Sequence, residues 1–146
     1  MHTPIGDITV AEEDGVIVSL DWGWGGDQIA TPLLTRARDQ LNEYFDGTRQ
    51  DFDLPLDPPG TEYRRKVWAA LRQIPYGETR TYGEIAAIAG GSARSVGQAN
   101  GSNPIPIIIP CHRVLAGNHL GGYSGAGGLD TKRTLLDLES PQASLA

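Results

Sequence analysis

A segment rich in proline and glycine divides the 146-residue chain into two unequal parts. Asp57-Pro58-Pro59-Gly60 interrupts both helices and strands, which makes it the clearest linker in the sequence. The charge balance changes sign at the same place. Residues 1–60 contain twelve acidic residues against three arginines, and residues 61–146 contain nine basic residues against six acidic ones. We therefore predict two domains, an acidic one over residues 1–57 and a basic one over residues 58–146.

The composition excludes several classes of protein. The hydrophobic fraction of 39% and the charged fraction of 21% are those of a soluble globular protein. No apolar run reaches the roughly 18–20 residues that a membrane span requires, and the first residues lack the features of a signal peptide. Cys111 is the only cysteine, which excludes an internal disulfide and disfavours a cysteine-based metal site. We expect a cytoplasmic protein.

The net charge of −6 argues against a nucleic acid as a partner of the whole surface. Because the basic residues follow the linker, a polyanion would meet the C-terminal half only. Charge alone does not separate this interpretation from two unrelated surface compositions.

The N-terminal part predicts a hairpin followed by a helix. Residues 8–12 and 16–22 are strand-like, and Asp14-Gly15 between them is a strong hairpin signal. Residues 32–47 begin with proline, carry apolar residues at helical spacing and end with glycine, as a helix does. Residues 52–54 suggest one more short strand.

The C-terminal part predicts a helix over residues 63–74 and then a pair of short helices. Residues 81–84 have the form of a capping box, and the glycines at 90–91 end the first helix of the pair. Ser92 can cap the second helix, over residues 93–101. Two short helices joined by a glycine turn form a candidate helix–turn–helix, although such pairs also occur as plain packing units.

The second helix of this pair alternates small residues, although glycine within a helix costs about 0.5–1 kcal/mol relative to alanine. These small residues are Ala93, Ser95, Gly97, Ala99 and Gly101. They would permit the close approach of either a DNA groove or a neighbouring helix, and the sequence favours neither.

Cys111 follows a rigid apolar segment. Residues 103–110 contain prolines that forbid a regular helix and isoleucines that bury the segment. Burial raises the pKa of a thiol, so a nucleophilic Cys111 would need a proton acceptor. His112 is adjacent and could act directly or through water. The alternative is an inert buried cysteine.

Two later features complete the candidate site. Glu139 ends a leucine-rich helix that begins near Leu129, where a carboxylate opposes the helix dipole by about 0.3–1 kcal/mol unless a cation such as imidazolium offsets it. Cys111, His112 and Glu139 could thus form a relay, although composition alone favours a solvated Glu139 on the surface. Residues 121–129 hold five glycines without the ending of a phosphate-binding loop, so we expect a lid with Tyr123 and Ser124 as its contact residues.

These residues resemble the O6-alkylguanine-DNA alkyltransferases, which repair DNA by direct reversal. The resemblance covers essentially all of residues 61–146, whereas residues 1–60 agree only in outline. Its most specific part is the Pro-Cys-His-Arg-Val run at residues 110–114, with an Asn-Pro pair that begins eight residues before the cysteine. The other matching residues are Tyr82, Arg94, Asn103, Tyr123, Ser124, Leu135, Leu136 and Glu139.

The resemblance implies an α+β fold with a small N-terminal α/β, ribonuclease H-like domain and a helical C-terminal domain carrying a winged-helix-like helix–turn–helix. It also implies a suicidal methyltransferase. Cys111 would accept the alkyl group of O6-alkylguanine irreversibly, in a single turnover. His112 would act as its base through water, oriented by Glu139, and Asn103 would support the network. Activity on O4-methylthymine stays open.

The remaining roles implied by the resemblance concern DNA. Arg94 would enter the base stack as an arginine finger, and Tyr82 would press on the phosphate so that the nucleotide flips out. Backbone carbonyls near Cys111 and Val114, with Tyr123 and Ser124, would hold the extruded base. Flipping is needed because an alkyl group on O6 projects into the duplex, and a weakened pair lowers its cost. Binding would depend on phosphates and the minor groove.

The sequence departs from the family pattern in its lid and in its possible metal ligands. The lid is longer by its Gly-Ala-Gly-Gly run, and we expect no cofactor and no metal, because only Cys111 and His2 could replace the zinc ligands of some relatives. The acidic domain would face away from the DNA. We expect a monomer, with cooperative assembly on DNA left open. A non-catalytic lesion-binding protein is the alternative, which Cys111 disfavours, and a hydrolytic cysteine enzyme is a more distant one.

Overall fold

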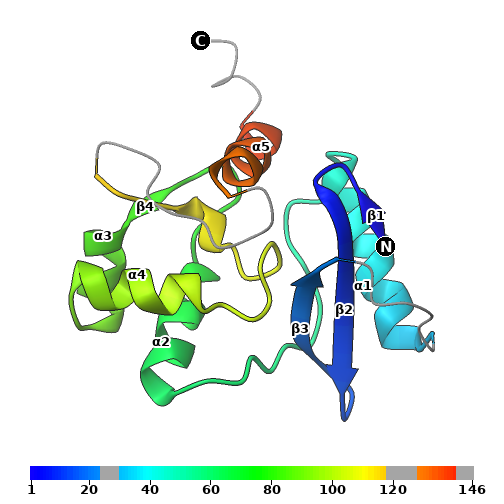
Figure 1. The fold of residues 1–146 in the computed structure, drawn as a ribbon, viewed down its shortest axis with the longest axis horizontal. Coiled ribbons are helices and arrows are strands. Elements are labelled where there is room, and N and C mark those ends of the chain that lie inside the picture. The colour runs from blue at the N-terminus through cyan, green and yellow to red at the C-terminus, as the bar shows by residue number, and fades with distance from the viewer. Residues whose placement is uncertain (24–29, 118–127, 141–146) are drawn as a thin grey trace.

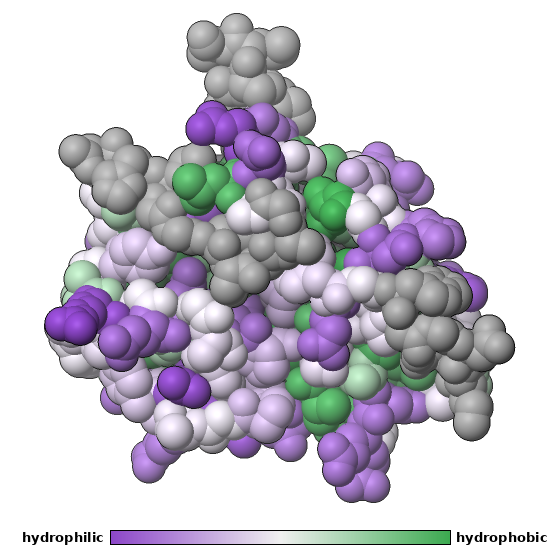
Figure 2. Space-filling model, in the orientation of Figure 1, coloured by the Kyte–Doolittle hydropathy of each residue, from purple (hydrophilic) through white to green (hydrophobic). Residues whose placement is uncertain are grey.

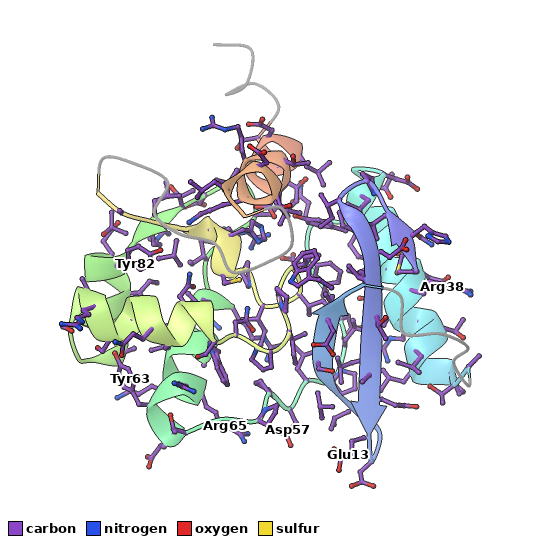
Figure 3. The ribbon with its side chains drawn as sticks, viewed as in Figure 1. Glu13, Arg38, Asp57, Tyr63, Arg65 and Tyr82 are labelled. Atoms are coloured by element: carbon purple, nitrogen blue, oxygen red, sulfur yellow. The ribbon has the colours of Figure 1, made fainter. Side chains whose placement is uncertain are left out.

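A computed structural model of the chain describes residues 1–23, 30–117 and 128–140, and it shows two halves joined by an extended linker (Figure 1). A small sheet with one helix forms the N-terminal half, and a group of short helices forms the C-terminal half. This confirms the predicted α+β class. Asp57 in the linker forms an ion pair of 2.8 Å with Arg65 at the start of the second half, and both side chains are labelled in Figure 3.

The N-terminal sheet is antiparallel, with strand order β1-β2-β3. Its strands are β1 (His2–Thr3), β2 (Gly6–Glu13) and β3 (Val16–Trp22). Asp14 and Gly15 both have positive φ angles, of 52° and 82°, as a tight hairpin turn between right-twisted strands requires. The predicted hairpin is therefore confirmed.

Helix α1 (Pro32–Phe45) packs against this sheet. Thr31 caps its start by accepting a hydrogen bond of 3.1 Å from the Leu34 amide. The helix buries one apolar side, with Ala37, Leu41 and Tyr44 fully enclosed. Tyr44 lies in its last turn, at the end of the helix that is on the same side of the molecule as the C-terminal helix (Figure 1).

The predicted strand at residues 52–54 is wrong. The segment is extended, but side chains of α1 take the backbone groups that a neighbouring strand would have bonded. Gln40 accepts from the Asp53 amide at 2.9 Å and donates to the Asp53 carbonyl at 3.1 Å. Leu56 then forms a single parallel bridge with Ile17 of β3.

Three helices form the framework of the C-terminal half: α2 (Glu62–Leu71), α3 (Tyr82–Ala89) and α4 (Ala93–Gly101). The predicted capping box at Thr81 and Glu84 is present, and Ser92 caps α4 as expected. The turn between α3 and α4 is crowded, because a Cβ at Gly91 would collide with the Tyr63 hydroxyl and with Ser95. The helix–turn–helix is therefore fixed by close packing at its turn.

Two short parallel strands, which the sequence did not predict, join this framework to the cysteine segment. β4 (Arg80–Thr81) pairs with β5 (Val114–Leu115). A 3₁₀ turn, η1 (Cys111–Arg113), precedes β5, and α5 (Leu129–Glu139) packs against η1. This arrangement brings Cys111, the start of α3 and the end of α5 into one region. No helix in the described part of the chain is long and apolar enough to cross a membrane.

Candidate active site

Cys111 sits at the end of a buried and firmly held segment. Asn103 bonds to both ends of this segment, accepting from the Ile105 amide at 3.0 Å and donating to the Ile109 carbonyl at 2.9 Å. Ile107 has a φ of 72°, which is strained for a β-branched residue. The Cys111 side chain retains only 3% of its exposed area. The expectation of a fixed, buried thiol is confirmed.

Burial raises the pKa of the Cys111 thiol to about 11, although a hydrogen bond with the Asn103 side chain and the charge of Lys132 both act to lower it. The thiol is therefore neutral near pH 7, and a nucleophilic thiolate forms only if a neighbouring base takes the proton.

His112 and Glu139 form a buried pair. His112 Nε2 lies 2.6 Å from Glu139 Oε2, and neither side chain has more than 1% of its area exposed. A solvated Glu139 is thus ruled out. Burial alone would raise the pKa of Glu139, but the bonds and charges of His112 and Arg113 outweigh it and hold the pKa at about 2. Glu139 is a permanent anion that fixes the orientation of the imidazole.

The tautomer of His112 follows from this bond. A carboxylate accepts only, so Nε2 carries the proton and Nδ1 keeps its lone pair. Nδ1 is buried and has no hydrogen-bond partner among the described residues, so it does not hydrogen-bond directly to the sulfur of Cys111. Burial lowers the pKa of His112 against the opposing effect of Glu139, and Arg113 and Lys132 add to the lowering. The ring is a neutral base.

Four further residues shape the site, and the sequence reasoning had assigned none of them a part in it. Arg113 donates from Nε to Glu139 Oε1 at 2.7 Å and from Nη2 to Oε2 at 3.1 Å. Tyr44 donates its hydroxyl to Glu139 Oε2 at 2.6 Å. Asn100, on α4, donates to the Cys111 carbonyl at 3.2 Å. These bonds connect both halves of the chain to the reactive segment.

Lys132 is the fourth of these residues. It has no exposed area, and its Nζ donates to the Val114 carbonyl at 2.7 Å. Burial lowers the pKa of Lys132 to about 8, so it is still a cation near pH 7. It lies on the buried face of α5 with Leu135 and Glu139, at spacings of three and four residues. That periodicity in the sequence could have identified it.

The residues expected to meet DNA lie on the helix–turn–helix. Tyr82 begins α3 and is half-buried (Figure 3), and Arg94 lies in the first turn of α4 and is exposed. A Cβ on Gly97 or Gly101 would meet no atom of the described residues within 4 Å. Packing against a neighbouring helix therefore does not explain these two glycines. Figure 2 shows mostly white and pale purple atoms over α4, which is a face of small and polar residues.

The expected lid lies outside the described residues, because Tyr123 and Ser124 fall within residues 118–127. Val114 is buried in β5, and its carbonyl already accepts the bond from Lys132. A carbonyl oxygen has two lone pairs, so one acceptor position on Val114 is still available to a base.

Comparisons with known protein families account for nearly the whole chain. The model described as "6-O-methylguanine DNA methyltransferase, ribonuclease-like domain" matches residues 1–58. The model described as "6-O-methylguanine DNA methyltransferase, DNA binding domain" matches residues 62–141.

Individual relatives agree with these matches. A methylated-DNA–protein-cysteine methyltransferase of Mycolicibacterium paratuberculosis is 48% identical over 95% of this chain and 89% of its own. The constitutive enzyme of that name from Bacillus subtilis is 44% identical, over 94% and 92%. The crystal structure of Mycobacterium tuberculosis OGT in complex with DNA superposes with a TM-score of 0.86 at 45% identity, covering 97% of this chain and 91% of the other.

Proposed function

The chain belongs to the 6-O-methylguanine DNA methyltransferase family as a methylated-DNA–protein-cysteine methyltransferase, and we propose that Cys111 is the residue that accepts the alkyl group from O6 of guanine. The observation that carries this proposal is the buried His112–Glu139 pair, which places a neutral imidazole with an unshared lone pair next in the chain to a buried, neutral thiol. DNA repair by alkyl transfer is the activity of this family, and the steps below are specific to these residues.

The reaction is a displacement at the alkyl carbon. His112 Nδ1 takes the thiol proton through a water molecule, and the sulfur of Cys111 attacks the carbon attached to O6. A carbon–sulfur bond forms as the carbon–oxygen bond breaks, and the electron pair of that bond goes to the purine. The proton held by His112 returns to the guanine, which leaves as the unmodified base.

The product explains a single turnover. Cys111 becomes a thioether, which has no ionisable proton and no good leaving group, so nothing in the relay can regenerate the thiol. Each molecule would then act once. A hydrolytic cysteine enzyme would instead release its intermediate to water and act repeatedly, which makes stoichiometry the distinguishing measurement.

Access to the lesion requires an extruded nucleotide. Cys111 is buried, and the alkyl group on O6 of a stacked guanine is out of its reach, so the base must rotate into the protein. Arg94 is exposed at the start of α4 and would fill the gap in the stack, while Tyr82 at the start of α3 would press on the phosphate. The open faces of Gly97 and Gly101 would allow α4 to approach the minor groove closely.

Base recognition would use main-chain groups. The carbonyls of Cys111 and Val114 are held in place by Asn100 and Lys132 respectively, and we propose that they accept from the exocyclic amine of the extruded guanine, with Tyr123 and Ser124 closing over it. The division at residues 57 and 58 would separate this DNA-binding part from the acidic domain.

The test is the mass of the intact protein after exposure to duplex DNA containing O6-methylguanine. We expect one methyl group per molecule, located on the peptide that contains Cys111, with the reaction stopping at one equivalent. The Cys111→Ala variant should bind the same duplex and acquire no methyl group. Turnover beyond one equivalent, or a methyl group on another residue, would refute the proposal. Binding of the lesion without any adduct would instead identify a lesion-binding protein.

A further inference from the structure

The catalytic carboxylate is shared between the two halves of the chain. Tyr44 lies in the last turn of α1, and Glu139 ends α5, 95 residues later. Figure 1 shows the C-terminal end of α1 and helix α5 at the same end of the molecule. The Tyr44 hydroxyl donates to Oε2 of Glu139 at 2.6 Å, and both groups are buried. A residue of the N-terminal domain therefore bonds directly to the carboxylate that holds His112.

One oxygen of Glu139 accepts hydrogen bonds from both Tyr44 and His112. Oε2 accepts from His112 Nε2 at 2.6 Å, from the Tyr44 hydroxyl at 2.6 Å and from Arg113 Nη2 at 3.1 Å. Each hydrogen bond to a carboxylate oxygen stabilises its negative charge and so makes the oxygen a weaker acceptor for the other donors. The negative charge available to His112 therefore depends on the Tyr44 hydroxyl.

The orientation of Glu139 does not need Tyr44. Arg113 bonds to both oxygens of the carboxylate and is itself held by a bond of 2.8 Å from Nη1 to the Ile74 carbonyl. A bidentate guanidinium fixes a carboxylate plane on its own. Removal of the Tyr44 hydroxyl would therefore leave the geometry and change the charge distribution.

We propose that Tyr44 is a positioning residue for alkyl transfer: by donating its hydroxyl to Glu139, it weakens the hold of the carboxylate on His112 and keeps the imidazole neutral and able to accept the thiol proton. This inference rests on the proposed role of His112 as the base. It gives the N-terminal domain a part in the chemistry, although none of the residues proposed to touch the substrate lies in that domain.

The charged and titratable groups around His112 set the direction of the effect. Glu139 favours the imidazolium form, while Arg113 and Lys132 oppose it. Tyr44 and Tyr76 complete the surroundings of the carboxylate, and burial raises the pKa of Tyr44 far above any working pH, so its hydroxyl always keeps its proton. With that donor removed, Glu139 attracts the imidazolium more strongly and the pKa of His112 rises.

The Tyr44→Phe variant tests this with two measurements. The first is the rate of benzyl transfer from free O6-benzylguanine as a function of pH, which needs no DNA. The acid limb of the profile should move to higher pH by about half to one unit, so that the rate on the limb falls roughly three- to tenfold while the plateau is retained. The second is the pKa of His112 from imidazole resonances, assigned with His2→Gln and His119→Gln spectra. It should rise by the same amount.

Tyr76→Phe is the matched control. This substitution removes the partly buried hydroxyl of Tyr76, whose ring packs against that of Tyr44. The Tyr76 hydroxyl donates to the Leu138 carbonyl at 3.2 Å and not to Glu139. Its pH profile and the pKa of His112 should match the wild-type protein. Thermal unfolding of both variants should confirm that each is folded.

A rate lowered equally at every pH, or an unchanged pKa of His112 in Tyr44→Phe, would overturn the proposal and leave Tyr44 as a packing residue. The resonance measurement does not use alkyl transfer. A wild-type protein that transfers no benzyl group would therefore refute the proposed function, while the effect of Tyr44 on His112 would still be decided by the titration.

Discussion

Substitution of Glu139 by glutamine should separate the structural and chemical roles of this carboxylate. Glutamine keeps the shape of the side chain but removes the charge that neutralises Arg113, which is 5% exposed. It also places an amide N–H where the surrounding groups are all donors. Removing one partner of a buried ion pair costs about 3–5 kcal/mol, a large share of the roughly 5–15 kcal/mol by which a domain is stable. We expect Glu139→Gln to lose stability on this scale and to transfer alkyl groups very slowly.

The pH dependence of this loss gives a second check. The pKa of Glu139 is about 2 in the folded protein against an ordinary 4.5, so its contribution is complete above about pH 4.5 and is lost as the pH falls toward 2. A shift of this size corresponds to about 3 kcal/mol. Urea unfolding of both proteins between pH 7 and pH 3 should therefore show a difference that is constant down to about pH 4.5 and narrows below it. A difference that is below about 1 kcal/mol at pH 7, or that stays constant in acid, would refute this reasoning.

A double variant separates stability from activity. In Glu139→Leu with Arg113→Met, an apolar pair of similar volume replaces the buried ion pair, a change that is often neutral or stabilising. We expect it to recover much of the stability lost in Glu139→Gln and none of the alkyl transfer. Recovery of activity with stability would show that the carboxylate is needed for folding alone.

Three other substitutions test the rest of the site. Lys132→Met should raise the pKa of the Cys111 thiol by removing a nearby cation, and alkylation by iodoacetamide at pH 8 should slow accordingly. Arg94→Ala should reduce repair of O6-methylguanine in duplex DNA far more than reaction with free O6-benzylguanine, with the exposed Arg38→Ala as control; equal losses would contradict its role in flipping. Gly97→Ala should raise thermal stability by about 0.5–1 kcal/mol, since its Cβ meets no atom, while it weakens binding to duplex DNA.

Features with local sequence signals were predictable. The Asp14-Gly15 turn, the cap at Thr81 and the helix that ends at Glu139 depend on residues within a few positions of each other, and the structure has them as expected. The strand predicted at residues 52–54 failed because Gln40, more than ten residues earlier, bonds to the backbone of that segment. The sequence of an extended segment does not show whether its backbone groups bond to another strand or to side chains.

Long-range partners had no such signal. β4 and β5 are two residues each and more than thirty apart in sequence, so neither shows a strand pattern. Tyr44 occupies a position on the apolar face of its helix, where an aromatic residue is expected to be plain core. The charge count of the C-terminal half also includes Arg113 and Lys132, which are buried in the site together with Glu139. Their charge acts on the site and is not presented to DNA.

In the proposed reaction, the buried charges around Cys111 and His112 would allow a thiol with a high pKa to act as a nucleophile. Before reaction the site holds the Glu139 anion and the Arg113 and Lys132 cations beside a neutral thiol and a neutral imidazole. Transfer of the proton from Cys111 to His112 would create one negative and one positive charge within the same enclosure, so the net charge would not change. Lys132 would then stabilise the thiolate and Glu139 the imidazolium. Return of the proton to the departing guanine would leave His112 neutral again, so no charge would have to cross into water at any step and the site would stay closed around the base.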